Sequence, residues 1–464
     1  MPNSLAYLML LIWPVVMIVM FRRMPAHKAL VWSLLGAYLF LPPAPTAFDF
    51  PLLPPFNKDS IPNLMVMVIC LAMFGRGVLT LPDSRVGKLL IAMFVLGPAV
   101  TVLTNSEPIP FQAAPALPGL RVTDAIALAI NQATLLFPVL LARSLLATPK
   151  EHRDLLMILM VCGLVYTIPM LIEVRLSPIL NLKVYGFFQH SFAQAVRFGG
   201  YRPVVFLNHG LWVAFFAMTT AMAALALWRA DRGERRSVYV LAAGYLILVL
   251  VLCKSLGALV FAIVLTPLIF FTSQRIQITI AFMVGLLALS YPVLKNTNLM
   301  PTQFLLQQAG KVNEERRGSL YFRFYNEDLL LERANEKPLF GWGSWGRNHL
   351  HDPVNGEIRT VTDGRWIIAF GVFGWIGFIA EFGLLTLPLI LLWRVSRVMP
   401  PGNMSPYVGP IALILAINVL DLLPNATLTP LTWLLAGALL GYVEKQSSNL
   451  PEGTQKRAPW RPIM

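Results

Sequence analysis

The chain has 464 residues, of which 56% are hydrophobic and only 13% are charged, and its mean hydropathy is +0.65. Apolar runs of membrane-spanning length recur along it, and no soluble core could bury so much apolar surface. The composition therefore excludes a soluble globular protein. It predicts an all-α polytopic membrane protein, and we expect no nucleic-acid partner despite a formal net charge of +14.

Apolar runs alternate with polar connectors and predict about thirteen helices, twelve or thirteen of them membrane-spanning. The first run lacks a basic start and a small-residue cleavage site, so it is interpreted as a first span. We expect about ten spans over 1–294, with a short basic outer loop at 173–203. A large outer loop with short helices is expected over 295–365, further spans over 366–443 and a cytoplasmic tail over 444–464. The predicted helices are 5–21, 29–42, 63–80, 89–104, 122–141, 155–172, 205–228, 237–253, 255–272, 276–294, 366–393, 406–423 and 429–443.

Lys and Arg gather in every second short connector. Examples are "RRMPAHK" from Arg22 and "RADRGERR" from Arg229, whereas "NSEPIPFQAAPALPG" from Asn105 has neither residue. Because cytoplasmic connectors are enriched in Lys and Arg, this pattern predicts an outer N-terminus and a cytoplasmic C-terminus.

The two long outer segments depart from this pattern, since four Lys and Arg residues lie in 173–203 and ten lie in 295–365. Long loops are translocated regardless of charge, so the predicted topology stands. One interpretation is that these cations only solvate loops or contact anionic lipid headgroups. The other is an outward-facing basic cavity for a polyanion such as a lipid-linked diphosphate, because Arg binds phosphate oxygens through two parallel hydrogen bonds.

Several familiar enzyme signatures are absent from the sequence. It contains no P-loop, no Rossmann glycine fingerprint, no G-x-S-x-G and no H-E-x-x-H. We therefore expect no ATP hydrolysis. The three cysteines lie within apolar runs and form no C-x-x-C pair, which favours neither a disulfide nor a zinc site.

The polar connectors and helix starts over 197–385 include "RFYNEDLLLERANEKPLFGWG" from Arg323, "RFGGYRPVVFLNHG" from Arg197 and "CKSLGALVFAIVL" from Cys253. These three stretches resemble the O-antigen ligase and polymerase superfamily of bacterial envelope glycosyltransferases. The first leads through a short polar segment into a helix rich in Gly and aromatic residues from Trp366, as in that family. The resemblance covers about 197–385.

Two positions differ from the family pattern. Ligases carry a His before the helix that follows the large loop, where this chain has Asp363, and many members have Arg where this chain has Leu256. A polymerase or exopolysaccharide relative therefore fits better than the lipopolysaccharide ligase itself.

The resemblance implies a GT-C-like enzyme of the bacterial inner membrane whose active site faces the periplasm. It would transfer or polymerise a glycan from an undecaprenyl-diphosphate-linked donor onto a glycan acceptor, without a cofactor or metal. Membrane lipids, and chain-length regulators or export proteins, would be its other partners. The diphosphate would contact Arg197, Arg202, Lys254, Arg323 and Arg365. Asp363, or alternatively Glu327, would be the base, and Trp342 and Trp345 would contact the glycan.

Simpler interpretations stand beside these roles. Asp363 could only cap the helix that follows it. The two tryptophans could belong to a tight turn at the membrane interface. Glu381, a carboxylate within an apolar run, is either part of a site or paired with a neighbouring helix. For the whole protein, the alternatives are a transporter or flippase for an anionic lipid-linked glycan and a noncatalytic component of a polysaccharide assembly system.

Overall fold

The computed structural model describes residues 1–50, 53–197, 199–400 and 402–448. Within them nearly all regular structure is helical, and two dipeptides form a small antiparallel ladder. A helix lies in each of the thirteen ranges that the sequence predicts. The elements are α1 (Ser4–Arg23), α2 (Ala26–Phe40), α3 (Ser60–Phe74), η1 (Arg76–Leu79), α4 (Arg85–Leu103), α5 (Val122–Leu145), α6 (Pro149–Leu176), α7 (Leu180–Tyr185), η2 (Phe192–Ala195), β1 (Val196–Arg197), β2 (Gly200–Tyr201), α8 (Gly210–Ala230), α9 (Arg236–Leu252), α10 (Leu256–Phe271), α11 (Gln274–Asn296), α12 (Thr302–Val312), α13 (Glu314–Glu336), α14 (Arg365–Val398), α15 (Val408–Asp421) and α16 (Pro430–Ser448).

Within the described residues, seven helices are long and apolar enough to cross a membrane, namely α1, α4, α5, α6, α8, α11 and α14. The same residues contain four shorter apolar helices, α3, α9, α10 and α15. Large apolar side chains are exposed on the outside of the bundle, among them Leu241 of α9 at 72% and Phe271 of α10 at 78%. Apolar surface of this extent is favourable in lipid and unfavourable in water. The chain is therefore an all-α polytopic membrane protein.

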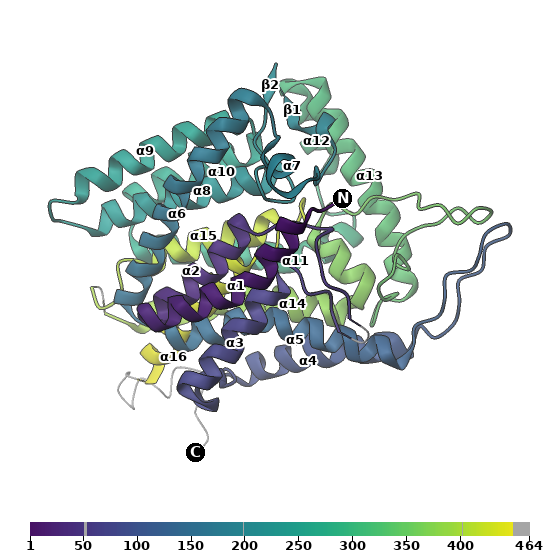
Figure 1. The fold of residues 1–464 in the computed structure, drawn as a ribbon, viewed down its shortest axis with the longest axis horizontal. Helices are drawn as coiled ribbons and strands as arrows, with labels where there is room; N and C mark the ends of the chain where they lie inside the picture. Colours follow the sequence, from purple (N-terminus) through teal and green to yellow (C-terminus); the bar gives the residue numbers. More distant parts are fainter. Residues whose placement is uncertain (51–52, 198, 401, 449–464) are drawn as a thin grey trace.

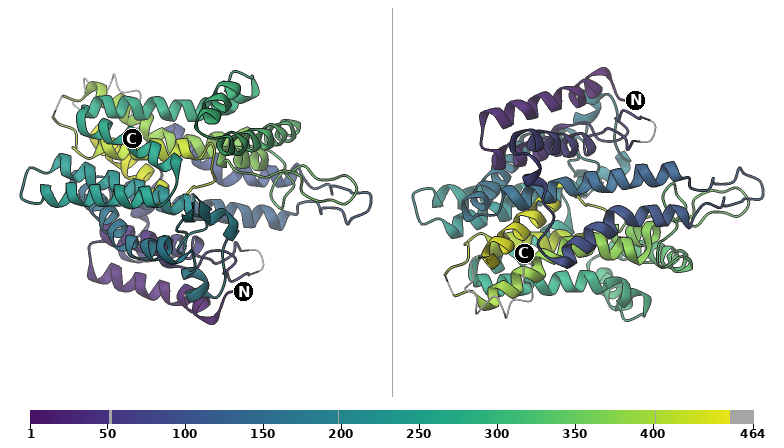
Figure 2. Two further views of the ribbon diagram at one scale, coloured as in Figure 1. Left: turned by 90° about the horizontal axis from the view of Figure 1, so that it is seen from above. Right: turned by 90° about the horizontal axis from the view of Figure 1, so that it is seen from below.

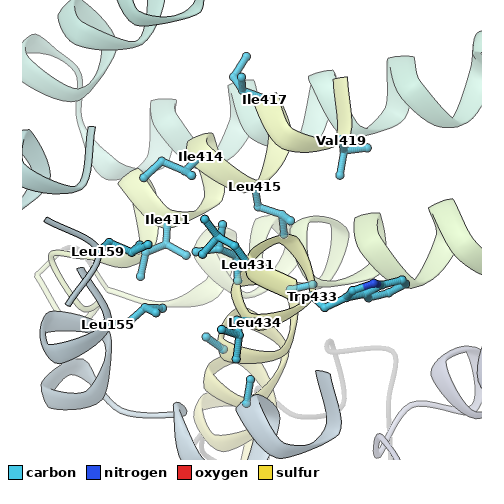
Figure 3. Packing of buried hydrophobic residues seen from close by; sticks show 14 of the residues in the cluster. Leu155, Leu159, Ile411, Ile414, Leu415, Ile417, Val419, Leu431, Trp433 and Leu434 are labelled. Atoms are coloured by element: carbon cyan, nitrogen blue, oxygen red, sulfur yellow. The ribbon is translucent and has the colours of Figure 1, made fainter. Parts of the chain in front are cut away.

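The core lies where α6, α8, α15 and α16 meet. Among the seven long apolar helices α8 is the most enclosed, with 83% of its apolar window buried. A Cβ at Gly163 of α6 would lie only 2.4 Å from the hydroxyl of Thr220 of α8, so this close approach requires glycine. Figure 3 shows Leu155 of α6, Ile411 of α15 and Leu434 of α16 packed together in this core.

Connectors that the charge pattern assigns to the same side contact one another. At the predicted cytoplasmic end, Arg143 of α5 pairs with Glu444 of α16 and, at 3.1 Å, with Asp83. At the opposite end, Lys337 pairs with Glu107 at 2.5 Å. The helices run between these two ends, along the long axis of the molecule (Figure 1). Connectors that alternate along the chain thus meet at opposite ends of the bundle, as the sequence predicts.

The predicted outer segment 295–365 contains the helices α12 and α13 followed by an extended hairpin. The N–H groups of Gln112 and Ala113 donate to the carbonyls of Pro353 and Val354 at 3.0 and 2.8 Å. This hairpin and the connector between α4 and α5 therefore project together from one end of the bundle (Figures 1 and 2).

The predicted tail 444–464 begins later than expected. Residues 444–448 still belong to α16, because the buried pairing of its last turn with α5 continues the helix. The rest of the predicted tail, 449–464, lies outside the described residues.

Candidate functional site

The connector between β2 and α8 is held rigidly from several sides. The carboxylate of Glu173, 1% exposed, accepts from the N–H groups of Val204 and Val205 at 2.8 and 2.7 Å. The side chain of Gln189 donates to the carbonyls of Val205 and Leu207 at 2.9 Å each. Val205 has a φ of 53°, which is rare for a β-branched residue. The surrounding contacts therefore impose a backbone shape that this connector would not adopt alone.

Lys58 fixes the same connector from the beginning of α3. Its Nζ donates to the carbonyl of Phe206 at 2.9 Å and lies 5.8 Å from the ring centroid of Tyr38. The side chain is 5% exposed, and burial lowers the pKa of Lys58 to about 8. A buried cation is thus placed directly against the connector.

Arg202 is the side chain that this rigid connector positions. It is 4% exposed, and its Nε and Nη2 are buried without a hydrogen-bond partner among the described residues. A Cβ at Gly210 would lie 2.7 Å from Nε, so the guanidinium lies against the first residue of α8. The unpaired N–H groups of a helix N-terminus carry partial positive charge. A buried cation with unsatisfied donors is costly unless an anion binds, so these features together make a candidate site for an anion.

More cations surround Arg202. Burial, followed by the positive charges of Arg197, Arg316 and Arg323, lowers the pKa of Arg202 to about 10. These arginines come from β1 and α13, far apart in the sequence. Because like charges raise the free energy of the empty site, a bound polyanion would relieve several repulsions at once.

Arg197 and Lys254 lie at the edge of the site, and both also contact other groups of the protein. Lys254 lies in the turn between α9 and α10, where its φ is 52°, and its Nζ donates to the carbonyl of Arg197 at 2.9 Å. The Arg197 guanidinium contacts the carboxylate of Glu315 at 3.3 Å. The Arg197 side chain is 30% exposed and that of Glu315 is 67% exposed, so this pair is weak.

His209 caps α8 beside Arg202. Its Nδ1 accepts from the N–H of Leu211 at 3.0 Å, and its Nε2 lies 3.2 Å from Oε1 of Gln194. Burial, followed by the charge of Arg202, lowers the pKa of His209 to about 3. A neutral ring accepts at Nδ1 and donates at Nε2, which satisfies both contacts.

Arg323 of α13 links the cations to a carboxylate. Its Nη1 donates to the carbonyl of Pro424 and to Oδ1 of Asn425 at 3.2 Å each, and its Nε lies 3.7 Å from Asp363. The side chain of Asp363 is 36% exposed. The N-cap of α14 is Gly364, and no side chain caps that helix. Capping is therefore not the role of Asp363, whose carboxylate stays accessible beside a cation.

Glu327 lies one helical turn beyond Arg323 but faces a different environment. It accepts from Nε1 of Trp366 at 2.6 Å and from the hydroxyl of Tyr291 at 3.2 Å, and Nζ of Lys295 lies 3.4 Å away. Burial raises the pKa of Glu327, and the Lys295 charge lowers it. Both carboxylate oxygens already have donors, so Glu327 ties α13 to α11 and α14.

Arg365 is paired with a buried carboxylate of its own helix. Its Nε and Nη2 donate to the carboxylate of Glu381 at 2.6 and 2.5 Å, and Glu381 is 1% exposed. A straight helix would separate these residues by about 24 Å. The contact forms because Gly374, with φ 65° and ψ −163°, breaks α14. The guanidinium of Arg365 is thus engaged within the fold and Glu381 is a paired carboxylate, whereas binding of the diphosphate by Arg365 stays a prediction.

The Pro-Leu-Phe-Gly-Trp-Gly turn maintains this break. The N–H groups of Trp342 and Trp375 donate to the carbonyls of Gly371 and Pro338 at 2.9 and 2.8 Å. A Cβ at Gly374 would lie 2.4 Å from the backbone of the turn, so only glycine fits there. The motif that carries the family resemblance thus has a clear structural role.

The two tryptophans of the turn differ in exposure. Trp342 is 9% exposed, its Nε1 donates to the carbonyl of Arg333 at 2.7 Å, and the guanidinium carbon of that arginine lies 3.3 Å from the ring centroid. Nζ of Lys337 lies 4.5 Å from the same centroid. These contacts correct the expectation that Trp342 offers a free face to a sugar. Trp345 is 70% exposed and retains an accessible ring.

The structure therefore brings part of the predicted set together and engages Arg365, Glu327 and Trp342 in contacts within the fold. Sequence reasoning missed Lys58 and Glu173, which shape the site without belonging to a motif. A charged residue at the end of an apolar run is the signal that could have found both. The residues brought together around the anion site are Arg197, Arg202, Lys254, Arg323 and Asp363.

Comparisons with known proteins give no assignment. No protein-family model matches the chain, and no curated protein matches it. The function is therefore inferred from the residues and geometry of the site.

Proposed function

We propose that this protein is a membrane glycosyltransferase of the O-antigen ligase or polymerase type, acting at the outer face of a bacterial inner membrane. It would transfer or polymerise a glycan from an undecaprenyl-diphosphate-linked donor, within a GT-C-like bundle of about thirteen spans. The observation that carries the proposal is the buried guanidinium of Arg202, whose Nε and Nη2 have no partner among the described residues. A diphosphate supplies the oxygens that these donors lack.

The reaction would proceed by displacement at the anomeric carbon of the donor sugar. The acceptor hydroxyl would lose its proton to Asp363 as its oxygen bonds to that carbon, and the bond to the diphosphate oxygen would break. Arg202, Arg197 and Arg323 would stabilise the charge that develops on the leaving lipid diphosphate. The 3.7 Å separation of Asp363 and Arg323 supports this pairing, because it places a base next to the cations.

The orientation of the protein can be tested by labelling. All three native cysteines are buried, so single cysteines can be introduced at exposed Val354 and Arg232 and treated in intact cells with an impermeant maleimide. The proposal requires labelling at position 354 and none at position 232 until the membrane is permeabilised. The reverse pattern would place the anion site in the cytoplasm and exclude this donor chemistry.

The reaction can be tested without knowing the sugar. The gene is deleted in its host, and extracted diphosphate-linked lipids and surface glycan are compared with those of a complemented strain. A missing transferase should leave lipid-linked glycan on the outer leaflet, where periodate added to spheroplasts oxidises it. Accumulation in a periodate-protected pool would instead indicate transport, and unchanged glycan and lipid profiles would indicate neither activity.

A further inference from the structure

We propose that an anionic phospholipid binds at the other end of the bundle, in a groove between the beginning of α11 and the end of α14. The groove has a volume of about 370 Å³ and is lined by Arg275, Ile276, Thr279, Ile280 and Arg397. It lies at the end that the Lys and Arg pattern assigns to the cytoplasm, so it is separate from the candidate glycan site.

Two arginines give this groove an uncompensated positive charge. Nη2 of Arg275 donates to the carbonyl of Met399 at 2.7 Å, which directs the guanidinium from α11 toward the end of α14. The guanidinium carbon of Arg397 lies 5.4 Å from the ring centroid of Trp393. Within the described part of the chain, neither arginine forms an ion pair with a carboxylate. The first turn of α11 has no acidic residue, so its N-terminal dipole adds to this charge.

An apolar track leads away from the two arginines. Ile276, Met283 and Leu287 of α11 are 49%, 56% and 45% exposed, and their spacing of seven and four residues places them on one face of the helix. Phe282 stacks on Trp393 with centroids 4.4 Å apart, which joins α11 to α14 beside the groove. The arrangement suits a molecule with an anionic head and a long apolar tail.

The two arginines and the apolar track together favour a phospholipid over a free anion as the ligand. The arginines bind phosphodiester oxygens, and the exposed face of α11 accommodates an acyl chain along the bilayer. A soluble phosphate would use the cations but not the apolar track. Phosphatidylglycerol and cardiolipin carry this chemistry, whereas phosphatidylcholine has a compensating positive charge.

Binding can be measured by native mass spectrometry of the full-length protein titrated with cardiolipin and, separately, with phosphatidylcholine. We expect preferential binding of cardiolipin that is weakened about 30-fold by combining Arg275→Gln with Arg397→Gln, since each arginine near a membrane surface contributes about a fivefold effect. Arg232→Gln, which removes an exposed arginine at the same end outside the groove, should leave binding unchanged.

Three results would overturn the proposal. They are wild-type cardiolipin binding by the double variant, equal binding of phosphatidylcholine by the native protein, and displacement of cardiolipin by inorganic phosphate. Thermal unfolding monitored by tryptophan fluorescence shows whether the double variant is folded. If the double variant is not folded, the single variant Arg397→Glu provides a second test. Because no step requires enzymatic activity, the outcome is independent of the proposed function.

Discussion

Two groups of charged residues lie at the same end of the bundle and differ in how they are paired. Around Glu327, donors from Trp366, Tyr291 and Lys295 occupy both carboxylate oxygens. Around Arg202, four arginines influence one another and the buried Nε and Nη2 donors have no partner among the described residues. Helix α13 contributes residues to both groups, so the difference in pairing is not a property of α13 alone.

The contacts around Glu327 stabilise the fold, whereas the buried donors of Arg202 are available to a ligand. A buried ion pair is expensive to break because the remaining partner loses its compensation. An unpaired buried cation destabilises the protein in its empty state, and such groups concentrate at functional sites. The group around Glu327 should therefore respond to mutation in stability, and Arg202 should respond in activity.

Replacing Arg202 should give the largest loss of activity. Arg202→Met preserves much of the side-chain volume but removes the guanidinium that is proposed to stabilise the leaving diphosphate. We expect glycan formation to fall by at least about 10³-fold, while the unfolding temperature stays the same or rises because a buried unpaired charge has been removed. The readouts are surface glycan in the complemented deletion strain and thermal unfolding of the purified protein.

The matched control is Arg317→Met, which removes an exposed arginine of α13 paired with Glu314 at 2.9 Å. It should retain wild-type glycan. Arg202→Lys should recover part of the activity, because an ammonium restores the charge without the planar donors. Normal glycan from Arg202→Met would show that the unpaired donors do not serve the reaction.

Replacing Asp363 tests the base. Asp363→Asn keeps the size of the side chain and removes its basicity, so turnover should fall by about 10² to 10⁴-fold without a change in unfolding temperature. Turnover is measured with purified protein in lipid and the lipid-linked glycan that accumulates in the deletion strain. The comparison variant Glu327→Gln should reduce stability and leave turnover largely intact. If Glu327→Gln instead loses turnover and Asp363→Asn loses only stability, Glu327 is the base.

The sequence predicted the helices well because apolar length and spacing are local properties. It also predicted correctly that Arg197, Arg202 and Arg323 would share an end of the bundle, since the parity of the spans decides this. Their convergence on one connector could not be predicted, because it depends on how β1 and α13 pack after folding.

Arg365 and Trp342 show what a motif cannot predict. Both were selected for their chemistry and their place in a motif, but in the folded chain Arg365 is paired with Glu381, and Trp342 is 9% exposed with Arg333 against its ring. The pairing of Arg365 with Glu381 depends on a single broken turn at Gly374, and glycines are frequent in membrane helices without such breaks. A motif gives residue types, whereas availability for a ligand is a property of the packed structure.

Breaking the pair of Arg365 and Glu381 should mainly reduce stability. Glu381→Gln leaves the guanidinium of Arg365 without its carboxylate, and we expect a loss of about 3 to 5 kcal/mol of unfolding free energy. Thermal unfolding in detergent measures the effect. Combining Arg365→Met with Glu381→Leu should restore most of the loss, because no unpaired charge remains. A destabilised double variant would show that the pair also has a positioning role at the break in α14.

The smallest expected effect concerns His209, the neutral cap of α8 beside Arg202. Its pKa of about 3 in the folded protein lies below the value of about 6.5 in an unfolded chain. Between these values the unfolded state binds more protons, so this residue should lower stability as the pH falls from 7 toward 4. His209→Asn keeps a capping side chain and removes the titration. The decrease in unfolding temperature between pH 7.5 and pH 5 should therefore be about 2 °C smaller than in the wild type, while His190→Asn, at the exposed neighbouring ring, should leave that decrease nearly unchanged. An identical pH dependence in wild type and His209→Asn would mean that the ring accepts a proton without cost and that the cations around Arg202 do not act on it.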